Sequence, residues 1–264
     1  MLSVNGIKIY VNHFPDHTQS WKFDLVDSSA ITIDWKYDND EELVTLIYLK
    51  KHLDSIIVGN VAINLFMPYI PNARMDRVKD TKDVFTLKYF AEVINSLNFN
   101  KVIVLDPHSY VAEALIDRLI IFTPKDYICD VIDEIHPDYL FFPDEGAMKR
   151  YAPLGFNLRY GFGVKDRDWT SGSILSLDIF GLPSDLSGKS ILIVDDICSK
   201  GGTFYHSAKA LKERGAGDIY LYVTHCENTI ADGELLKTDL IEKIFTTDSI
   251  YRLKHEKVQV IKYE

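Results

Sequence analysis

Hydrophobic positions recur at helical spacing in several segments of the chain, and short apolar runs lie between these segments. In the first segment, Leu43, Leu46 and Leu53 fall on one side of a helix whose first turn carries acidic residues, a placement that the helix dipole favours. The pattern predicts helices over about 41–54, about 83–97, a stretch through Ala112, Leu115 and Leu119, and about 203–214.

The apolar runs between the helical segments predict buried strands. They cover residues 61–67, 102–105, 139–142, 191–194 and 220–224. Strands that alternate with helices predict βαβ units with right-handed crossovers, and therefore an α/β fold with mainly parallel sheets flanked by helices. The least periodic stretch, about 122–137, predicts a boundary between two similar halves, residues 1–125 and 126–264.

Composition and charge narrow the classes of protein that this chain can represent. The 264 residues are 47% hydrophobic and 26% charged, which is typical of globular proteins and excludes a disordered chain. Lys and Arg total 29 against 39 Asp and Glu, a net charge of −10, which argues against binding to nucleic acid or to an anionic membrane surface.

Cysteine usage and hydropathy predict where the protein resides. The three cysteines, Cys129, Cys198 and Cys226, form no CxxC pair and are typical of a reducing compartment. No signal peptide is visible at the start of the chain, and no apolar run approaches the length of a membrane span. We therefore expect a soluble, cytoplasmic protein.

Acidic residues and a histidine follow three of the predicted strands. They are Asp106 with His108, Asp144, and the pair Asp195 and Asp196. In open parallel sheets ligands bind beyond the carboxyl ends of the strands, and carboxylates placed there suit sugar hydroxyls or a hard cation. Aspartates are also common turn formers and helix caps, so each residue taken alone is equally consistent with a structural role.

The segment from Ser190 to Thr203, SILIVDDICSKGGT, carries the most specific signal. A buried strand delivers Asp195 and Asp196, and a glycine-containing loop then leads into a helix. Loop amides and a helix N-terminus form an anion site, and glycine lets the backbone approach a phosphate closely. The residues expected to hold the phosphate are Ser199, Lys200, Gly201, Gly202 and Thr203. Together with a carboxylate pair for the diol, they predict a ribose 5-phosphate site.

This segment resembles the PRPP-binding loop of type I phosphoribosyltransferases and ribose-phosphate pyrophosphokinases. Four further segments, in the same order as in the pyrophosphokinases, resemble blocks of that family alone: 70–77 (IPNARMDR), 105–109 (LDPHS), 142–150 (FPDEGAMKR) and 164–167 (VKDR). Thr224-His225 matches the TH that follows the next strand. The chain is therefore identified as similar to ribose-phosphate pyrophosphokinases, as a short and divergent member with two phosphoribosyltransferase-like halves.

The resemblance implies a reaction and roles for particular residues. ATP would donate its diphosphoryl group to the C1 hydroxyl of ribose 5-phosphate, giving PRPP for nucleotide biosynthesis and AMP. Lys165 and Arg167 would be catalytic, and Mg²⁺ would contact His108 and Asp144. The residues implied in ATP binding are Arg74, Met75 and Asp76 and, in an element that reaches across a subunit boundary of a homo-oligomer, Phe14, Asp16 and Thr18.

Departures from the family pattern leave alternatives open. Met75 stands where the family has Gln and Asn72 where it has Tyr, which bears on nucleotide selectivity. Two rival functions remain: a phosphoribosyltransferase that consumes PRPP, and a non-catalytic regulatory homologue. Each implied residue also has a simpler interpretation, because Lys165 and Arg167 could be surface cations and Arg74 could form a surface ion pair with Asp76 or Asp80.

Overall fold

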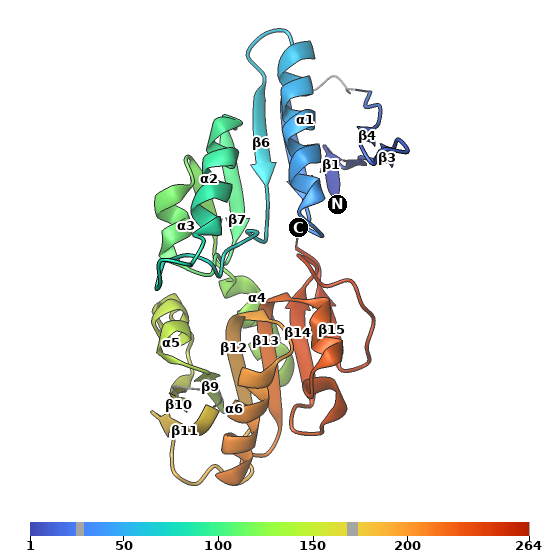
Figure 1. Ribbon diagram of the computed structural model, residues 1–264. Helices are drawn as coiled ribbons and strands as arrows, with labels where there is room; N and C mark the ends of the chain where they lie inside the picture. Colours follow the sequence, from blue (N-terminus) through green and yellow to red (C-terminus); the bar gives the residue numbers. More distant parts are fainter. Residues whose placement is uncertain (25–28, 168–173, 264) are drawn as a thin grey trace. The chain divides into compact units, whose positions relative to one another are not determined.

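The computed structural model describes residues 1–24, 29–167 and 174–263, and its chain divides into two compact units, Met1–Thr123 and Pro124–Glu264 (Figure 1). Each unit holds a mainly parallel sheet flanked by helices, so the predicted α/β class is confirmed. No helix in the described part of the chain is long and apolar enough to cross a lipid bilayer.

The first unit contains a six-stranded sheet in the order β2-β1-β5-β6-β7-β8, in which β5 to β8 are parallel and β1 and β2 are antiparallel. Its strands are β1 (Leu2–Val4), β2 (Ile7–Lys8), β5 (Ala30–Trp35), β6 (Ala62–Phe66), β7 (Lys101–Leu105) and β8 (Leu119–Phe122). A separate hairpin pairs β3 (Asn12–His13) with β4 (Gln19–Ser20). The helices are α1 (Glu41–Ile56), α2 (Thr86–Ser96) and α3 (Tyr110–Leu115).

The second unit contains a seven-stranded sheet in the order β11-β10-β9-β12-β13-β14-β15, parallel except for β11. Its strands are β9 (Tyr139–Phe142), β10 (Arg159–Arg167), β11 (Ile174–Phe180), β12 (Ile191–Cys198), β13 (Ile219–Cys226), β14 (Lys243–Thr247) and β15 (Val258–Ile261). The helices are α4 (Lys125–Ile135), α5 (Glu145–Tyr151) and α6 (Gly202–Glu213), with 3-10 turns η1 (Ala152–Leu154), η2 (Asn228–Asp232) and η3 (Leu235–Lys237).

Strand β12 is covered on both faces, which explains its uninterrupted apolar run. Ile191 and Ile193 pack in a cluster with Phe204, Ala208 and Leu211 of α6. Leu192 and Val194 pack in a second cluster, whose other members include Ile128 and Val131 of α4 and Ala147 and Tyr151 of α5. Successive side chains of a strand point to opposite faces, so this alternation fixes which layer each later residue of β12 meets.

Two of the predicted helices have different bounds in the structure. The helix through Ala112 ends at Leu115, because Ile116 is extended and Arg118 takes a φ of +54°. Leu119, expected on that helix, begins strand β8 instead. Helix α2 begins at Thr86 rather than near 83, because the Asp83 side chain accepts hydrogen bonds from the backbone N–H groups of Lys79 and Asp80 in the preceding turn.

The stretch 122–137, predicted to be irregular, contains helix α4. Only Ile128 and Val131 of this helix are buried, and it carries four acidic residues, Asp126, Asp130, Asp133 and Glu134. Ile132 and Ile135 pack on the same cluster as Ile128 and Val131, so apolar residues do recur at helical spacing here and the prediction of an irregular stretch was wrong. His136 ends the helix in the left-handed conformation, with a φ of +47°.

Candidate functional site

The loop between β12 and α6 lies against the segment that follows β13. Gly201 has a φ of +78°, and a Cβ built there would lie 2.2 Å from Cδ1 of Leu235. A Cβ on Gly233 would lie 1.9 Å from the backbone oxygen of Lys200, so only glycine permits this approach. Gly202 begins α6, with nothing within 4 Å of its own Cβ position. The loop therefore packs closely against Gly233 and Leu235. We call the loop, together with the N-terminus of α6, the braced turn; its open side lies at Gly202.

Asp195 and Asp196 lie within strand β12, which continues to Cys198, and do not follow its end as predicted. The Asp196 side chain is buried, and its Oδ2 lies 2.8 Å from Nη1 of Arg150 on α5. Asp195 accepts a hydrogen bond from the backbone N–H of Asp196 at 2.9 Å. Each carboxylate therefore has a partner within the second unit.

The two carboxylates experience opposite environments. Burial, followed by the negative charge of Asp196 and that of Asp144, raises the pKa of Asp195 well above its ordinary value. Asp196 instead faces a guanidinium, which favours its charged form. The pair thus combines one carboxylate at ion-pair distance from a guanidinium with one whose ionisation is disfavoured.

Asp144 follows β9 and caps helix α5. Its side chain accepts a hydrogen bond from the backbone N–H of Ala147 at 3.0 Å, the usual N-cap interaction. Its charge also acts on Asp195. Asp144 therefore has the structural role of a helix cap and also contributes negative charge to the acidic end of β9 and β12.

The backbone of Lys165 and Arg167 lies in strand β10. Lys165 pairs with Leu177 and Arg167 with Ile174 of β11, with a register shift between Asp166 and Arg167. The hairpin adds to the sheet next to β9, the strand that delivers Asp144. The structure therefore places these two residues on a β-hairpin, and their side chains lie outside the described atoms.

In the first unit, Asp76 in the segment that follows β6 interacts with His108 and Ser109 in the segment that follows β7. Asp76 is buried, and its Oδ1 accepts a hydrogen bond from Nε of Arg77 at 3.0 Å. Burial raises the pKa of Asp76, but hydrogen bonds from Ser109 and Arg77 and the positive charge of Arg77 and His108 outweigh it, and the net pKa is lowered. The structure thus brings Asp76 and His108 together, while Arg74 and Met75 lie exposed beside them.

The residues Phe14, Asp16 and Thr18 lie at the tip of the β3–β4 hairpin. Phe14 is 55% exposed. Asp16 accepts hydrogen bonds from the backbone N–H of Thr18 at 3.0 Å and from its hydroxyl at 2.7 Å, and these bonds lower the pKa of Asp16. The tip is therefore a self-bonded turn that presents an aromatic ring to solvent.

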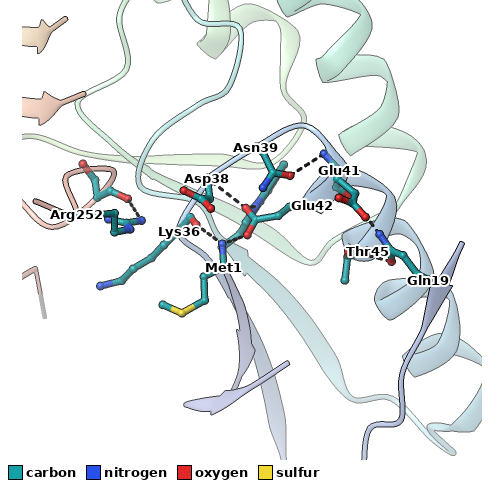
Figure 2. Close-up of polar contacts among 11 residues, drawn as sticks. Met1, Gln19, Lys36, Asp38, Asn39, Glu41, Glu42, Thr45 and Arg252 are labelled. Carbon is teal, nitrogen blue, oxygen red and sulfur yellow. Dashed lines mark hydrogen bonds and ion pairs between the residues drawn. The ribbon is translucent and has the colours of Figure 1, made fainter. Parts of the chain in front are cut away.

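A cavity of about 280 Å³ lies between the base of this hairpin, strand β1 and the start of α1. Figure 2 shows its polar wall, where Gln19 accepts from the Thr45 hydroxyl at 3.0 Å and Glu42 accepts from the N-terminal ammonium. Glu42 also accepts from the Trp35 indole N–H and from the backbone N–H of Asp38, each at 2.9 Å. These wall groups bond to the protein itself, so the cavity offers no evident role in the predicted site.

Thr224 and His225, matched as a motif, are fully interior in the structure. Nδ1 of His225 lies 2.8 Å from the Ser249 hydroxyl, and the Thr224 carbonyl accepts from the Thr247 hydroxyl at 2.6 Å. They tie the end of β13 to β14. A contact that sequence reasoning missed is the ion pair of Arg150 with Asp196, because it depends on the face of β12 on which Asp196 lies.

The predicted metal ligands do not form a metal site by themselves. Within the described residues, no group of three or more His, Cys, Asp and Glu side chains is arranged to hold a metal ion. His108 and Asp144 belong to different units. The protein therefore offers single ligands, each on its own sheet.

Comparison with known proteins gives one consistent relationship. The family described as "Phosphoribosyl synthetase-associated domain" matches residues 177–263. "Ribose-phosphate pyrophosphokinase" from Staphylococcus epidermidis is 26% identical over 199 residues, 71% of this chain and 60% of that protein. "Ribose-phosphate pyrophosphokinase 2" from Enterococcus faecalis is 27% identical over 231 residues, 84% of this chain and 68% of that protein.

The solved phosphoribosylpyrophosphate synthetase from Mycobacterium smegmatis has the same fold. It superposes with a TM-score of 0.75 at 17% identity and covers 97% of this chain and 86% of its own. Strands, loops and helices that carry the candidate site thus lie in a fold already seen in a solved protein.

Proposed function

We propose that this chain, whose resemblance to ribose-phosphate pyrophosphokinases is confirmed, transfers the diphosphoryl group of ATP to the C1 hydroxyl of ribose 5-phosphate. The products would be PRPP and AMP. The match spans 60% of the length of the Staphylococcus epidermidis relative, and activity, substrates and cofactor are accordingly part of the proposal.

One observation carries the proposal: strand β12 delivers two carboxylates directly into a braced glycine turn at the N-terminus of α6. The loop amides and the helix dipole favour a phosphate at Gly202 and Thr203, with the ammonium of Lys200 nearby in sequence. Asp195 and Asp196 offer acceptors for a vicinal diol. A phosphate site beside acceptors for two hydroxyls is the arrangement that a pentose phosphate requires.

The remaining residues would supply charge and orientation. Lys165 and Arg167, on the hairpin next to β9, would stabilise negative charge on the transferring phosphoryl oxygens. Arg74 and Asp76 would hold ATP, and Phe14 would stack on its base. Catalysis of this kind requires mainly in-line positioning of nucleophile and leaving group.

The family resemblance implies Mg²⁺. Hard cations prefer carboxylate oxygens, and the negative charges of Asp144 and Asp196 around Asp195 form an environment that a cation would stabilise. The carboxylate of Asp144 suits Mg²⁺, which it would contact in the second unit with most ligands coming from ATP and water, and His108 of the first unit offers a separate, less usual nitrogen donor. Bound there, Mg²⁺ would neutralise charge on the ATP phosphates.

The deciding experiment measures AMP release from Mg-ATP with and without ribose 5-phosphate. AMP that forms only when ribose 5-phosphate is present, together with PRPP in equal amount, supports the proposal. Formation of a nucleotide from PRPP and a free base, without AMP release, would instead identify a phosphoribosyltransferase. Binding of ribose 5-phosphate without turnover under either condition would identify a non-catalytic homologue.

A further inference from the structure

The two adjacent aspartates of β12 lie on opposite faces of that strand, because successive side chains alternate. Asp196 follows Leu192 and Val194, whose side chains pack in the cluster with α4 and α5. That face leads Asp196 to helix α5, and its Oδ2 lies 2.8 Å from Nη1 of Arg150. The contact follows from strand alternation, because a shift of one residue would turn Asp196 to the face that packs on α6.

Arg150 is held in place by its own surroundings. It lies in the last turn of α5, where a cation interacts favourably with the helix dipole. Its guanidinium carbon lies 5.6 Å from the centroid of the Tyr151 ring, and the Tyr151 ring stacks on Phe142 of β9. The Arg150 side chain is 22% exposed and that of Asp196 is 5% exposed, so the pair is largely shielded from water.

We propose that Arg150 is a positioning residue that fixes the Asp196 carboxylate as an acceptor for a ribose hydroxyl, and thereby contributes to selection of ribose over 2-deoxyribose. The inference rests on the proposed function of the β12–α6 site. The guanidinium lies at ion-pair distance from Oδ2, so its charge anchors the Asp196 carboxylate before a ligand arrives. A preorganised charged acceptor strengthens a hydroxyl hydrogen bond and loses little conformational entropy on binding.

The positioning role predicts a selective defect. Arg150→Gln removes the charge but keeps a hydrogen-bonding side chain, so Asp196 keeps its carboxylate without a fixed orientation. We expect KM for ribose 5-phosphate to rise about tenfold to a hundredfold, the value of one hydrogen bond to a charged group. The value for 2-deoxyribose 5-phosphate should change less, so discrimination between the two sugars falls. Arg150→Lys keeps the charge and should restore part of the discrimination.

Lys149→Gln is the matched control. Lys149 lies one position earlier on α5, is exposed and forms only a solvent-facing ion pair with Glu145 at 3.2 Å among the described contacts. Both sugar phosphates are assayed at saturating Mg-ATP with kcat and KM determined separately, and the melting temperature is recorded for every variant. The control should leave kcat and KM for both sugar phosphates, and the melting temperature, near those of the wild type.

The outcomes separate the inference from the function on which it rests. A wild-type protein that releases no AMP with ribose 5-phosphate overturns the proposed function. If the wild type is active and Arg150→Gln raises KM equally for both sugar phosphates, the inference is overturned, because a purely structural role would have this effect. If Arg150→Gln does not fold, the double variant Arg150→Gln/Asp196→Asn removes both charges, and retained ribose discrimination in that variant also overturns the inference.

Discussion

The acidic sites of the two units differ in how their carboxylates are balanced. In the first unit Asp76 has a guanidinium from Arg77, a hydroxyl from Ser109 and the imidazole of His108 around it, and its pKa is lowered. In the second unit Asp195 lies between other carboxylates and its pKa is raised. The same strand-loop-helix arrangement thus produces an internally neutralised site in one unit and an excess of negative charge in the other.

The difference indicates what each site requires from a ligand. A carboxylate already paired with cations contributes little further attraction to a cation and serves to hold its neighbours in place. Carboxylates without enough cations are stabilised by hydroxyl donors or by a metal ion. The excess negative charge in the second unit is therefore consistent with the ribose diol and Mg²⁺ of the proposed function, and five substitutions test this comparison.

The largest effect concerns the cations proposed to serve the acidic unit. Lys165→Ala and Arg167→Ala should each lower kcat by about 10²–10³, or about 3–4 kcal/mol, because their contacts form as charge develops on the phosphoryl oxygens. KM for ribose 5-phosphate should change much less. Steady-state kinetics of AMP release provides the measurement, and unchanged kcat in both variants would remove the catalytic assignment of the β10–β11 hairpin.

The next effect tests Asp196, the member of the acidic pair of β12 that forms an ion pair. Asp196→Asn removes the carboxylate charge that lies 2.8 Å from Nη1 of Arg150 in a largely buried position. Loss of one partner of a buried pair costs about 3–5 kcal/mol, and about 2 kcal/mol is expected here because Arg150 is partly exposed and asparagine can still accept one hydrogen bond. Urea unfolding at neutral pH measures the change, and a stability equal to that of the wild type would mean that the ion pair contributes nothing.

A smaller loss is expected in the first unit. Asp76→Asn should destabilise the protein by about 1 kcal/mol at neutral pH, since its Arg77 partner is mostly exposed to solvent. The pKa of Asp76 is lowered in the folded protein, so its stabilisation is present above the unfolded value near 3.8 and is lost as the pH falls through the lower folded value. Unfolding experiments over this acidic range should show a weaker pH dependence in the variant.

The smallest effect has the opposite sign. The folded chain holds a proton on Asp195 that the unfolded chain releases near pH 3.8, so wild-type stability should fall as the pH rises through the raised folded pKa. Asp195→Asn removes this fall and should raise the melting temperature at neutral pH, although the amide is a weaker acceptor for the Asp196 N–H. A lower melting temperature in the variant would contradict the charge imbalance on which the comparison rests.

The sequence predicted the elements of the site best where an apolar run and the glycines that follow it were enough to define them. The strand from Ile191, the glycine turn and helix α6 depend on local residues, and all three are present. The β10–β11 hairpin was not predicted, because the sequence of β10 contains glycines and two cations and lacks an uninterrupted apolar run. The pairing of β10 with β11 is evident only in the structure. Leu119 fits helical spacing equally well as a strand start, and only the pairing of β7 with β8 decides between them.

The charge balance of the site could be predicted only in part. The acidic pair is evident in the sequence, but the partner of Asp196 is 46 positions away and depends on which face of β12 meets α5. The burial of Thr224 and His225 likewise follows from packing of β13 beside β14 and not from the motif. Motif residues therefore located the site, and strand alternation determined which of them neutralise one another.

The indole of Trp35 provides a way to observe the first unit alone. This side chain is fully buried, its N–H donates to Glu42, and it lies against Tyr37 and Phe90 within the core of that unit. Trp21 belongs to the same unit, whereas Trp169 is the one tryptophan in the sequence of the second. In a Trp169→Phe protein, emission spectra during denaturation would follow the first unit only, while circular dichroism follows both, so the offset between the two curves would measure how strongly the halves unfold as one cooperative system.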